Sequence, residues 1–396
     1  MLFDHIGIHG WDDIEPLILS AVVSDHSVLF IGDIGSNKTE GSKIIAKALL
    51  GDNIKFRNYE VPTLNFDDLI GFVNPKNLAN GTLEFVPTPL SIWNADAALF
   101  DEINRANPFI QSKLHELIRT RTLMGLPTQL KMVFSAVNPP ERYQSGYMDM
   151  ALASRFICVQ VPNITSMKDA HIDQIISGNG HRPPPPFDLK DMILKARRCQ
   201  FSHEEITRVH QMCKKIILEL SSQEIIFNGR QLRMMTKMIK AGLALRHASG
   251  MEQFADPDTI TAYIISVIPE LQGVVRSNAN HGMVQGTIRS IVSGFTLGDP
   301  VTIASDIKEL CEVNITDSLA WVSAMKQMAD MEEDPDTLKQ AIHKIKTLTG
   351  KEVIEQELAF NLVQYIATQI IFKTVLKEDV PIMHLLKRAN EIAASI

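Results

Sequence analysis

The chain has few cysteines, no long apolar run and no excess of positive charge, and each absence excludes a class of protein. Its four cysteines, Cys158, Cys199, Cys213 and Cys311, show neither CxxC nor zinc-ligand spacing, so we expect reduced thiols. No apolar run approaches the roughly 18 residues that cross a bilayer. The first residues contain no basic stretch followed by an apolar core, so we expect no signal peptide. Together these absences predict a cytoplasmic protein without a membrane span.

Positive charge is in the minority, with 39 Lys and Arg against 46 Asp and Glu and a formal net charge of −7. This balance disfavours a surface built mainly for nucleic acid. No basic stretch interleaved with aromatic residues is present either, which further disfavours a nucleic-acid translocase. The content of 45% hydrophobic and 21% charged residues is ordinary for a globular protein, and 396 residues predict two or three domains.

The first half alternates short apolar runs with helical patterns. The predicted strands are Val28–Ile31, Ala97–Phe100, Met132–Ala136 and Ile157–Val161. Helical patterns lie between them, as at Thr39–Leu50 and Pro108–Thr120. Continuous apolar strands separated by helices predict an α/β domain with a parallel sheet covered on both faces. We expect this domain to span residues 1–187 and to end at the four consecutive prolines within 182–187.

Beyond the prolines the pattern is helical, and residues 188–272 are predicted to form a small lid-like helical domain. Ser202 with a glutamate three residues later is a capping-box signature, and the amphipathic helix that it opens runs to about Ser221. A second helix is predicted over Arg230–His247. Asp256 followed by proline opens a third, since proline is tolerated in a first turn.

The last part of the chain has weaker signals. Five glycines predict a linker or irregular segment over 273–300. Residues 301–396 are predicted to form an all-α module of unknown role, with helices over Asp336–Thr349 and Lys351–Leu376. We expect docking or oligomerisation from this module rather than catalysis.

A phosphate-binding pattern follows the first predicted strand. It reads Gly32, Asp33, Ile34, Gly35, Ser36, Asn37, Lys38 and Thr39. A phosphate-binding loop needs inward-pointing N–H groups, a lysine for the β- and γ-phosphates and a hydroxyl for Mg²⁺. Lys38 and Thr39 supply the last two, and the helix that begins here adds the positive end of its dipole. The alternative is an ordinary turn between a strand and a helix.

Asn37 departs from the GxxxxGK[ST] pattern because it replaces the second glycine. Asparagine tolerates a left-handed backbone better than most side chains, so the loop is expected to keep its shape. Its side chain would nevertheless crowd the phosphates.

Polar residues at two strand ends complete the pattern. Asp101 and Glu102 close the run Ala97–Phe100. In P-loop enzymes the first acid supports Mg²⁺ and the second polarises the attacking water, so Asp101 joins Thr39 as a predicted metal ligand and Glu102 is predicted to be catalytic. Asn138 is predicted to reach the γ-phosphate and the water if its strand lies between the other two.

Two arginines are candidates for further contacts with phosphate. Arg155, before the last predicted strand, is the candidate arginine finger, and the alternative is a surface arginine. Arg230, at the start of a helix, is predicted to reach back over the phosphates, with Arg233 as a competitor. Arg105 or Arg121 becomes the finger candidate if Arg155 fails.

Over roughly residues 10–270 the chain resembles the MoxR-like AAA+ ATPases. The resemblance rests on Leu83–Leu90 (LEFVPTPL), Phe100–Ala106 (FDEINRA), Gln111, Ser112, Leu114, Glu116, Arg121, Ala136–Pro140 (AVNPP) and Ser154–Phe156 (SRF). It implies a P-loop AAA+ core with a Walker A loop at 32–39 and a Walker B motif at Asp101 and Glu102. It also implies sensor 1 at Asn138, an arginine finger at Arg155 and sensor 2 at Arg230.

The resemblance further implies ATP and Mg²⁺ as cofactors and a homo-oligomeric, hexameric ring that remodels a protein partner, often a von Willebrand factor A domain protein. Two insertions, within 62–89 and at a hairpin over about 120–131, are implied to face the pore or client. Asp33, Ile34 and Thr88 also depart from the family pattern, besides Asn37. Two functions therefore stay open: a hydrolysing motor, and a nucleotide-binding assembly or scaffold subunit with weak hydrolysis, which Asn37 favours.

Overall fold

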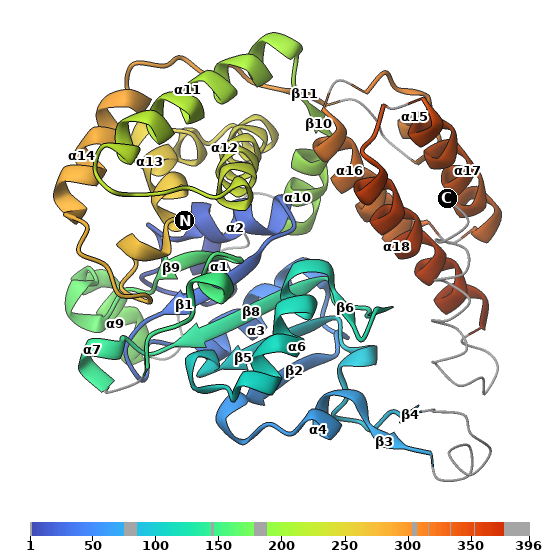
Figure 1. The fold of residues 1–396 in the computed structure, drawn as a ribbon, viewed down its shortest axis with the longest axis horizontal. Helices are drawn as coiled ribbons and strands as arrows, with labels where there is room; N and C mark the ends of the chain where they lie inside the picture. The colour runs from blue at the N-terminus through green and yellow to red at the C-terminus, as the bar shows by residue number, and fades with distance from the viewer. Residues whose placement is uncertain are drawn as a thin grey trace.

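The structure of the chain is a computed structural model. It describes residues 2–74, 85–143, 146–177, 188–302, 307–315, 317–332, 334–351 and 353–375. Figure 1 shows a twisted sheet with its own helices, a second group of helices over one side of it, and the C-terminal helices to the right. The proline run at 182–187, with which the first domain was predicted to end, lies outside the described residues.

A five-stranded parallel sheet forms the first group, in the order β2-β5-β8-β1-β9. The strands are β1 (Ser27–Ile31), β2 (Phe56–Glu60), β5 (Ala97–Asp101), β8 (Met132–Val137) and β9 (Phe156–Gln160). Four of them confirm the predicted apolar runs. The sequence analysis missed β2 because its residues, FRNYE, are mostly polar. A strand at the edge of a sheet tolerates such residues, since part of it faces solvent.

Alternate residues of each strand enter two separate cores, which confirms a sheet covered on both faces. On β1, Val28 and Phe30 pack into one core, and Leu29 and Ile31 pack into the other. The first core includes α2 (Glu15–Val23), α3 (Lys38–Leu50) and the second group of helices, and the other includes α6 (Pro108–Thr120). This α/β arrangement brings the carboxyl ends of β1, β5 and β8 to one edge of the sheet.

Short elements connect the strands. They are α1 (Leu2–Ile6), η1 (Val61–Thr63), α4 (Phe66–Ile70), β3 (Phe72–Val73), β4 (Phe85–Val86), η2 (Ile92–Asn94), η3 (Ile103–Arg105), β6 (Thr122–Leu123), β7 (Leu126–Pro127), α7 (Pro140–Tyr143), α8 (Met150–Ala153), η4 (Ile164–Ser166) and α9 (Asp169–Ser177). The predicted hairpin over 120–131 is present as β6 and β7 and turns at Met124 and Gly125, both with positive φ. The carboxylate of Glu116 accepts hydrogen bonds from both N–H groups of that turn. Within the other predicted insertion β3 pairs with β4, and residues 75–84 lie outside the described part.

The second group contains α10 (Leu189–Arg197), β10 (Cys199–Gln200), α11 (His203–Ser221), α12 (Gly229–Ser249), η5 (Glu252–Phe254), α13 (Pro257–Ser266), η6 (Pro269–Leu271) and α14 (His281–Val292). Ser202 caps α11 as predicted, because its Oγ accepts from the N–H of Glu205 at 3.2 Å. The Glu205 carboxylate accepts instead from the N–H of Gly298, at 2.7 Å, and also binds Arg208. Asp256 caps α13 at the predicted position.

The prediction of irregular structure throughout 273–300 is wrong, because α14 occupies the middle of that segment. Asn280 caps the helix through its side chain, and Val284, Ile288 and Ile291 are buried. These residues join the core that α11 and α13 also line. The helix was not predicted because of the glycines at 282, 286 and 294. Glycine lowers helix propensity but does not prevent a helix that is stabilised by packing.

The C-terminal residues begin with β11 (Val301–Thr302), which pairs with β10. The helices α15 (Ile307–Glu312), α16 (Ser318–Met331), α17 (Pro335–Gly350) and α18 (Gln356–Val375) follow and enclose a core of their own. Within the described residues of 301–375 the all-α prediction is confirmed apart from β11, and α18 begins five residues later than predicted. No helix among the described residues combines the length and apolarity needed to cross a membrane.

Candidate nucleotide-binding site

The loop between β1 and α3 has the backbone shape that a phosphate-binding loop needs. Gly35 has φ +80° and Asn37 has φ +64°, so Asn37 adopts the left-handed conformation predicted for it. Gly32 is packed tightly, because a Cβ there would lie 2.8 Å from Oγ of Ser36. The backbone of Arg142 and Tyr143 belongs to α7, and their side chains support the loop. Arg142 pairs with Asp33 at 2.9 Å, and the Tyr143 hydroxyl accepts from the N–H of Ile34 at 3.3 Å.

Lys38 is the buried cation of this loop, with 8% of its surface exposed. Its Nζ donates to the carbonyl oxygens of Gly32, at 2.7 Å, and Asp33, at 2.8 Å. It also donates to Oδ1 of Asn138 at 3.1 Å. Burial lowers the pKa of Lys38, and the nearby carboxylates, Asp101 first, oppose that shift. The lysine is therefore held at the end of β1 and linked to the end of β8.

Thr39 and Asp101 offer two oxygen donors to a magnesium ion. Oγ1 of Thr39 lies 3.5 Å from Oδ2 of Asp101, and Oδ1 of Asp101 accepts from the N–H of Glu102 at 2.9 Å. Hydroxyl and carboxylate oxygens are ligands that Mg²⁺ accepts, usually together with water and phosphate oxygens. These residues therefore fit the ion that the sequence predicts.

Glu102 is held by two partners. Its backbone is left-handed, with φ +52°, an uncommon conformation for a residue other than glycine. Oε1 accepts from Nδ2 of Asn138 at 3.4 Å, and Oε2 pairs with Arg105 at 3.1 Å. The sequence analysis did not find the second pair, although Glu102 and Arg105 stand three residues apart. The pair was not predicted because it depends on the single 3₁₀ turn η3, which brings the two side chains together.

These groups line a cleft of about 720 Å³, called here the nucleotide cleft. It is lined by Ile34, Gly35, Ser36, Asn37, Lys38, Thr39, Glu40, Glu60, Pro62, Thr63, Asp101, Glu102 and Asn138. Strand β8 lies between β5 and β1, which is the condition that the sequence analysis set for Asn138. The lining residues at 60–63 went unpredicted because they follow β2, the strand without an apolar signature.

A second cavity of about 700 Å³, called here the side cavity, lies on the other side of the loop and shares residues 34–37 with the nucleotide cleft. One part of its wall comes from the N-terminal segment, with His9 and Trp11. Another comes from the segment around α9, with Met167, Gln174 and Ile175. The sequence analysis assigned no function to these residues, because no motif marks them.

The two predicted arginines lie together and line neither cavity. Arg230 donates to Oγ of Ser154 at 3.3 Å, and Arg155 donates to the carbonyl of Ala151. Burial lowers the pKa of Arg155, and the neighbouring charges of Arg230 and Arg119 lower it further. In this chain, then, Arg155 and Arg230 are brought together, and neither lines a cavity at the loop between β1 and α3.

The other arginines have different environments. Arg233, the competitor of Arg230, is exposed on α12. Arg121 is bound to the sheet, since it donates to Oγ of Ser27 at 2.9 Å and to the carbonyl of Ile118 at 2.6 Å. Arg105 is paired with Glu102.

Residues 27–156 match the family model of the AAA domain of the dynein-related subfamily. This segment has the P-loop AAA+ fold. It contains the loop, both acids, Asn138 and Arg155, and the match confirms the predicted fold class. AAA+ domains in general bind a nucleotide with Mg²⁺, act as ATPases and commonly assemble into rings.

Two solved structures align with the chain. A candidate ATPase from Cytophaga hutchinsonii aligns with a TM-score of 0.53 and 16% identity, over 75% of this chain and 94% of that chain. A full-length MCM homolog from Methanopyrus kandleri aligns with a TM-score of 0.46 and 12% identity, over 69% and 59%. No curated protein matches the chain. At 16% identity, the first likeness supports the P-loop AAA+ fold alone.

Proposed function

We propose that the chain is a Mg²⁺-dependent ATPase motor of MoxR-like type that works as a ring and remodels a protein partner. The observation that carries the proposal is that the predicted site residues lie in two separate places. Lysine, acids and Asn138 meet in the nucleotide cleft, while Arg155 and Arg230 lie together outside it. A complete site then needs arginines from a neighbouring subunit.

Asn37 does not block the cycle in this proposal, because its left-handed backbone keeps the loop in shape and its side chain is exposed at the cleft. Lys38 donates to the β- and γ-phosphates in place of the loop carbonyls that it contacts here. Thr39 and Asp101 would hold Mg²⁺, which supplies charge neutralisation for phosphoryl transfer when it is bound.

Glu102 orients and polarises the attacking water in this proposal, and Asn138 positions it. The carboxylate must first leave Arg105, with which it pairs at 3.1 Å. Asn138 contacts both Lys38 and Glu102, so it is placed to link the phosphate side of the cleft to the catalytic acid. The pair of Glu102 and Arg105 would thus restrain hydrolysis until the cleft is filled and the ring is formed.

Arg155 is the finger in this proposal and acts on the site of the adjacent subunit. Removal of its charge should leave ATP affinity nearly intact and lower turnover by about 10³–10⁵-fold, as for other arginine fingers. The measurement is steady-state phosphate release by Arg155→Ala, with nucleotide binding measured in parallel. Arg289→Ala is the matched control, because Arg289 is an exposed arginine of α14 that lines neither cavity, and it should keep the parental rate.

Mixing separates action in trans from action within one chain. Subunits with Arg155→Ala retain an intact loop, and subunits with Lys38→Ala retain an intact arginine. A mixed ring therefore contains interfaces that pair the two intact halves and should recover part of the activity. An inactive mixture, despite confirmed subunit exchange, would contradict a finger at Arg155 acting in trans.

The competing function is a nucleotide-binding assembly or scaffold subunit with weak hydrolysis. Asn37 favours it, because its side chain lines the nucleotide cleft where the P-loop pattern has glycine. Slow phosphate release by the assembled parental ring would support this second function. A pull-down from native extract with Glu102→Gln as a trap identifies the protein partner, for which we propose a von Willebrand factor A domain protein.

A further inference from the structure

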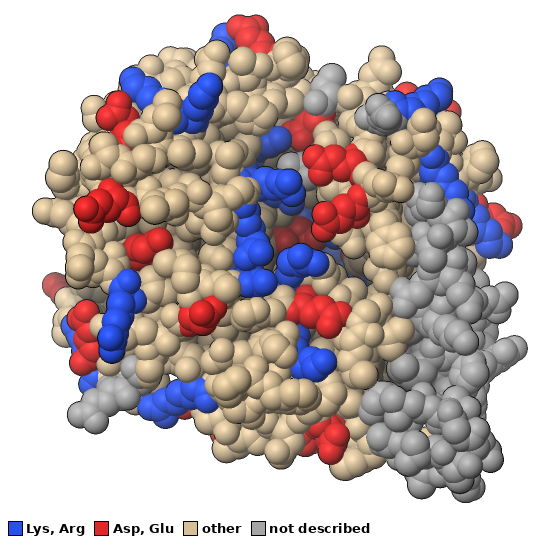
Figure 2. Space-filling view, viewed as in Figure 1, with Lys and Arg blue, Asp and Glu red and all other residues tan. Residues whose placement is uncertain are grey.

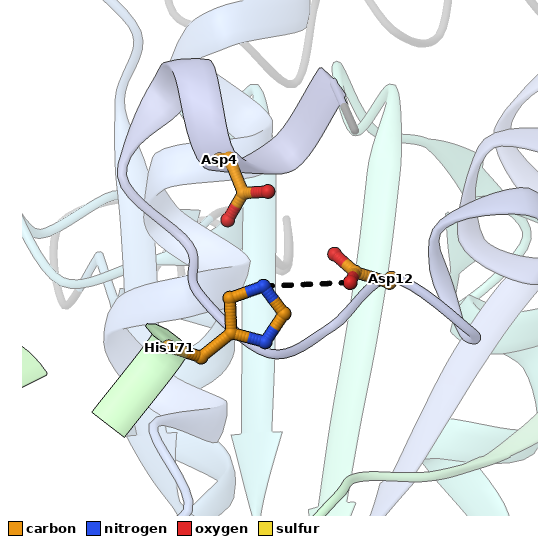
Figure 3. A group of neighbouring side chains, drawn as sticks. All are labelled: Asp4, Asp12 and His171. Carbon is orange, nitrogen blue, oxygen red and sulfur yellow. Dashed lines mark ion pairs between the residues drawn. The ribbon is translucent and has the colours of Figure 1, made fainter. Parts of the chain in front are cut away.

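Two carboxylates and an imidazole from three separate segments meet beside the side cavity. Asp4 belongs to α1, Asp12 to the loop before α2, and His171 to α9. One ligand-type atom of each residue lies within 4.8 Å of those of the other two. Figure 3 shows the three side chains facing one another between these segments. This mixed set of donors lies outside the nucleotide cleft and has no role in the proposed ATPase cycle.

The side chains of this cluster are largely buried. The side chains of Asp12 and His171 are each 12% exposed and are 3.4 Å apart at their closest charged atoms. Asp4 is 27% exposed, and Nδ1 of His9 lies 3.1 Å from its Oδ1. Positive charge nearby favours two carboxylates held this close, and a bound cation would add to the charge that Lys168 supplies. Lys168 approaches Asp12 at 3.6 Å, but its side chain is 77% exposed and solvated.

We propose that Asp4, Asp12 and His171 bind one divalent transition-metal ion, and that Zn²⁺ is a suitable occupant. Two carboxylate oxygens and one imidazole nitrogen are donors that zinc accepts. Imidazole disfavours Mg²⁺, which prefers oxygen ligands, so the site is chemically distinct from the magnesium site at Thr39 and Asp101. Three protein ligands leave further positions for water.

His9 supports one of the proposed ligands without being one itself. Its Nδ1 contacts the Asp4 carboxylate, and partners of this kind orient the ligands of metal sites. Loss of such a partner typically lowers metal affinity by about 10–100-fold. His9 also lines the side cavity, so the proposed metal site and that cavity share a wall.

The metal would join two walls of the side cavity. The N-terminal segment contributes Trp11 to one wall, and the α9 segment contributes Gln174 to another. Asp12 follows Trp11 directly, and His171 precedes Gln174 by less than one helical turn. An ion shared by Asp12 and His171 therefore restrains the distance between the walls. This step rests on the proposed function and adds to it that the side cavity, which shares residues 34–37 with the nucleotide cleft, holds the part of the nucleotide beyond the phosphates.

Zinc content tests the site directly. The full-length protein is dialysed against Zn²⁺ in the presence of excess Mg²⁺, and bound zinc is then measured by elemental mass spectrometry. We expect one zinc per parental chain, loss of that zinc in Asp12→Asn and in His171→Ala, and about 10–100-fold weaker binding in His9→Ala. His5→Ala is the matched control, since His5 lies in α1 outside the cluster, and it should bind as the parent does.

Lys168→Ala distinguishes a metal site from a set of ion pairs. Removal of a cation that competes for Asp12 should leave zinc affinity unchanged or raise it. Zinc should also raise the melting temperature of the parent and of Lys168→Ala, but not that of Asp12→Asn, whose folding is checked by circular dichroism. Absence of zinc from the parent, or equal zinc binding by His171→Ala, would overturn the proposal.

Nucleotide binding separately tests the proposed coupling between the metal site and the side cavity. Zinc should raise the nucleotide affinity of the parent by about 5–150-fold, the usual range for coupled sites, and should have no such effect in His171→Ala. Lys38→Ala should keep its zinc and lose nucleotide, so failure of nucleotide binding is distinguishable from failure of the metal site. Bound zinc without any change in nucleotide affinity would overturn the coupling of the two cavities.

Discussion

The nucleotide cleft and the junction with the C-terminal helices both gather charged side chains, but the two regions use them differently. In the cleft, Thr39 is exposed and Asp101 is half-buried, so their oxygens remain accessible to a ligand. At the junction, Lys240 of α12 pairs with Asp317 at 2.6 Å, and their side chains are only 9% and 3% exposed. Charges that face a cleft are available for chemistry, whereas charges buried against each other hold parts of the molecule together.

Other contacts at the junction follow the same pattern. Lys326 of α16 pairs with Asp25, which follows α2, at 2.9 Å, and the Tyr365 hydroxyl of α18 donates to Asp330 at 2.6 Å. Burial lowers the pKa of Lys237 to about 8. Figure 2 shows basic and acidic side chains together around a hollow at the centre of the view. The ion pairs of Lys326 and Lys240 connect α16 and the residue before it to Asp25 and to α12, and the Tyr365 hydroxyl connects α18 to α16.

The largest effect on the cleft is expected from Lys38→Ala. It should abolish nucleotide binding, because the loop loses the cation that contacts the β- and γ-phosphates. The measurement is titration with a fluorescent ATP analogue. Lys47→Ala is a suitable control, since Lys47 lies in the last turn of α3 and does not line the cleft. Unchanged affinity in Lys38→Ala would remove the basis for the P-loop assignment.

Glu102→Gln should separate binding from hydrolysis. The amide keeps the size of the side chain but cannot act as a base, so turnover should fall by about 10²–10⁴-fold while ATP binding persists. Single-turnover hydrolysis and nucleotide binding are measured on the same preparation. Hydrolysis at the parental rate would show that another residue activates the water.

At the junction, Lys240→Ala should affect stability and leave the chemistry of the cleft intact. A buried aspartate without its partner costs about 3–5 kcal/mol in the free energy of unfolding. Chemical denaturation followed by circular dichroism measures this loss. The double variant Lys240→Met, Asp317→Leu should recover much of it, because no unpaired charge is left behind. Equal losses in the single and double variants would contradict a buried ion pair.

The smallest effect is expected from Asn37→Gly. If the asparagine side chain crowds the phosphates, glycine should tighten ATP binding or speed turnover by several-fold, which the binding and phosphate-release assays detect. Glycine adopts the left-handed conformation of this position freely, so the loop should keep its shape. An unchanged variant would remove the main support for a weakly hydrolysing scaffold.

Much of the fold was predictable because its signals are local. Apolar strands such as Val28–Ile31 and the caps at Ser202 and Asp256 depend on neighbouring residues, and each is present in the structure. Strand β2 and helix α14 were missed because burial and packing by distant segments outweigh their weak local patterns. The division into domains, the MoxR-like type and the partner stay predictions.

By itself the sequence determined the loop and strand-end residues of the nucleotide cleft, but not the lining residues that follow β2. Lys38, Asp101 and Asn138 follow predictable strands, and parallel strands bring their carboxyl ends to one edge. Only the tertiary structure decided which distant residues meet elsewhere: Arg155 with Arg230, or Asp12 with His171. Such encounters depend on how separate segments pack against each other, and no local period or spacing in the chain encodes that packing.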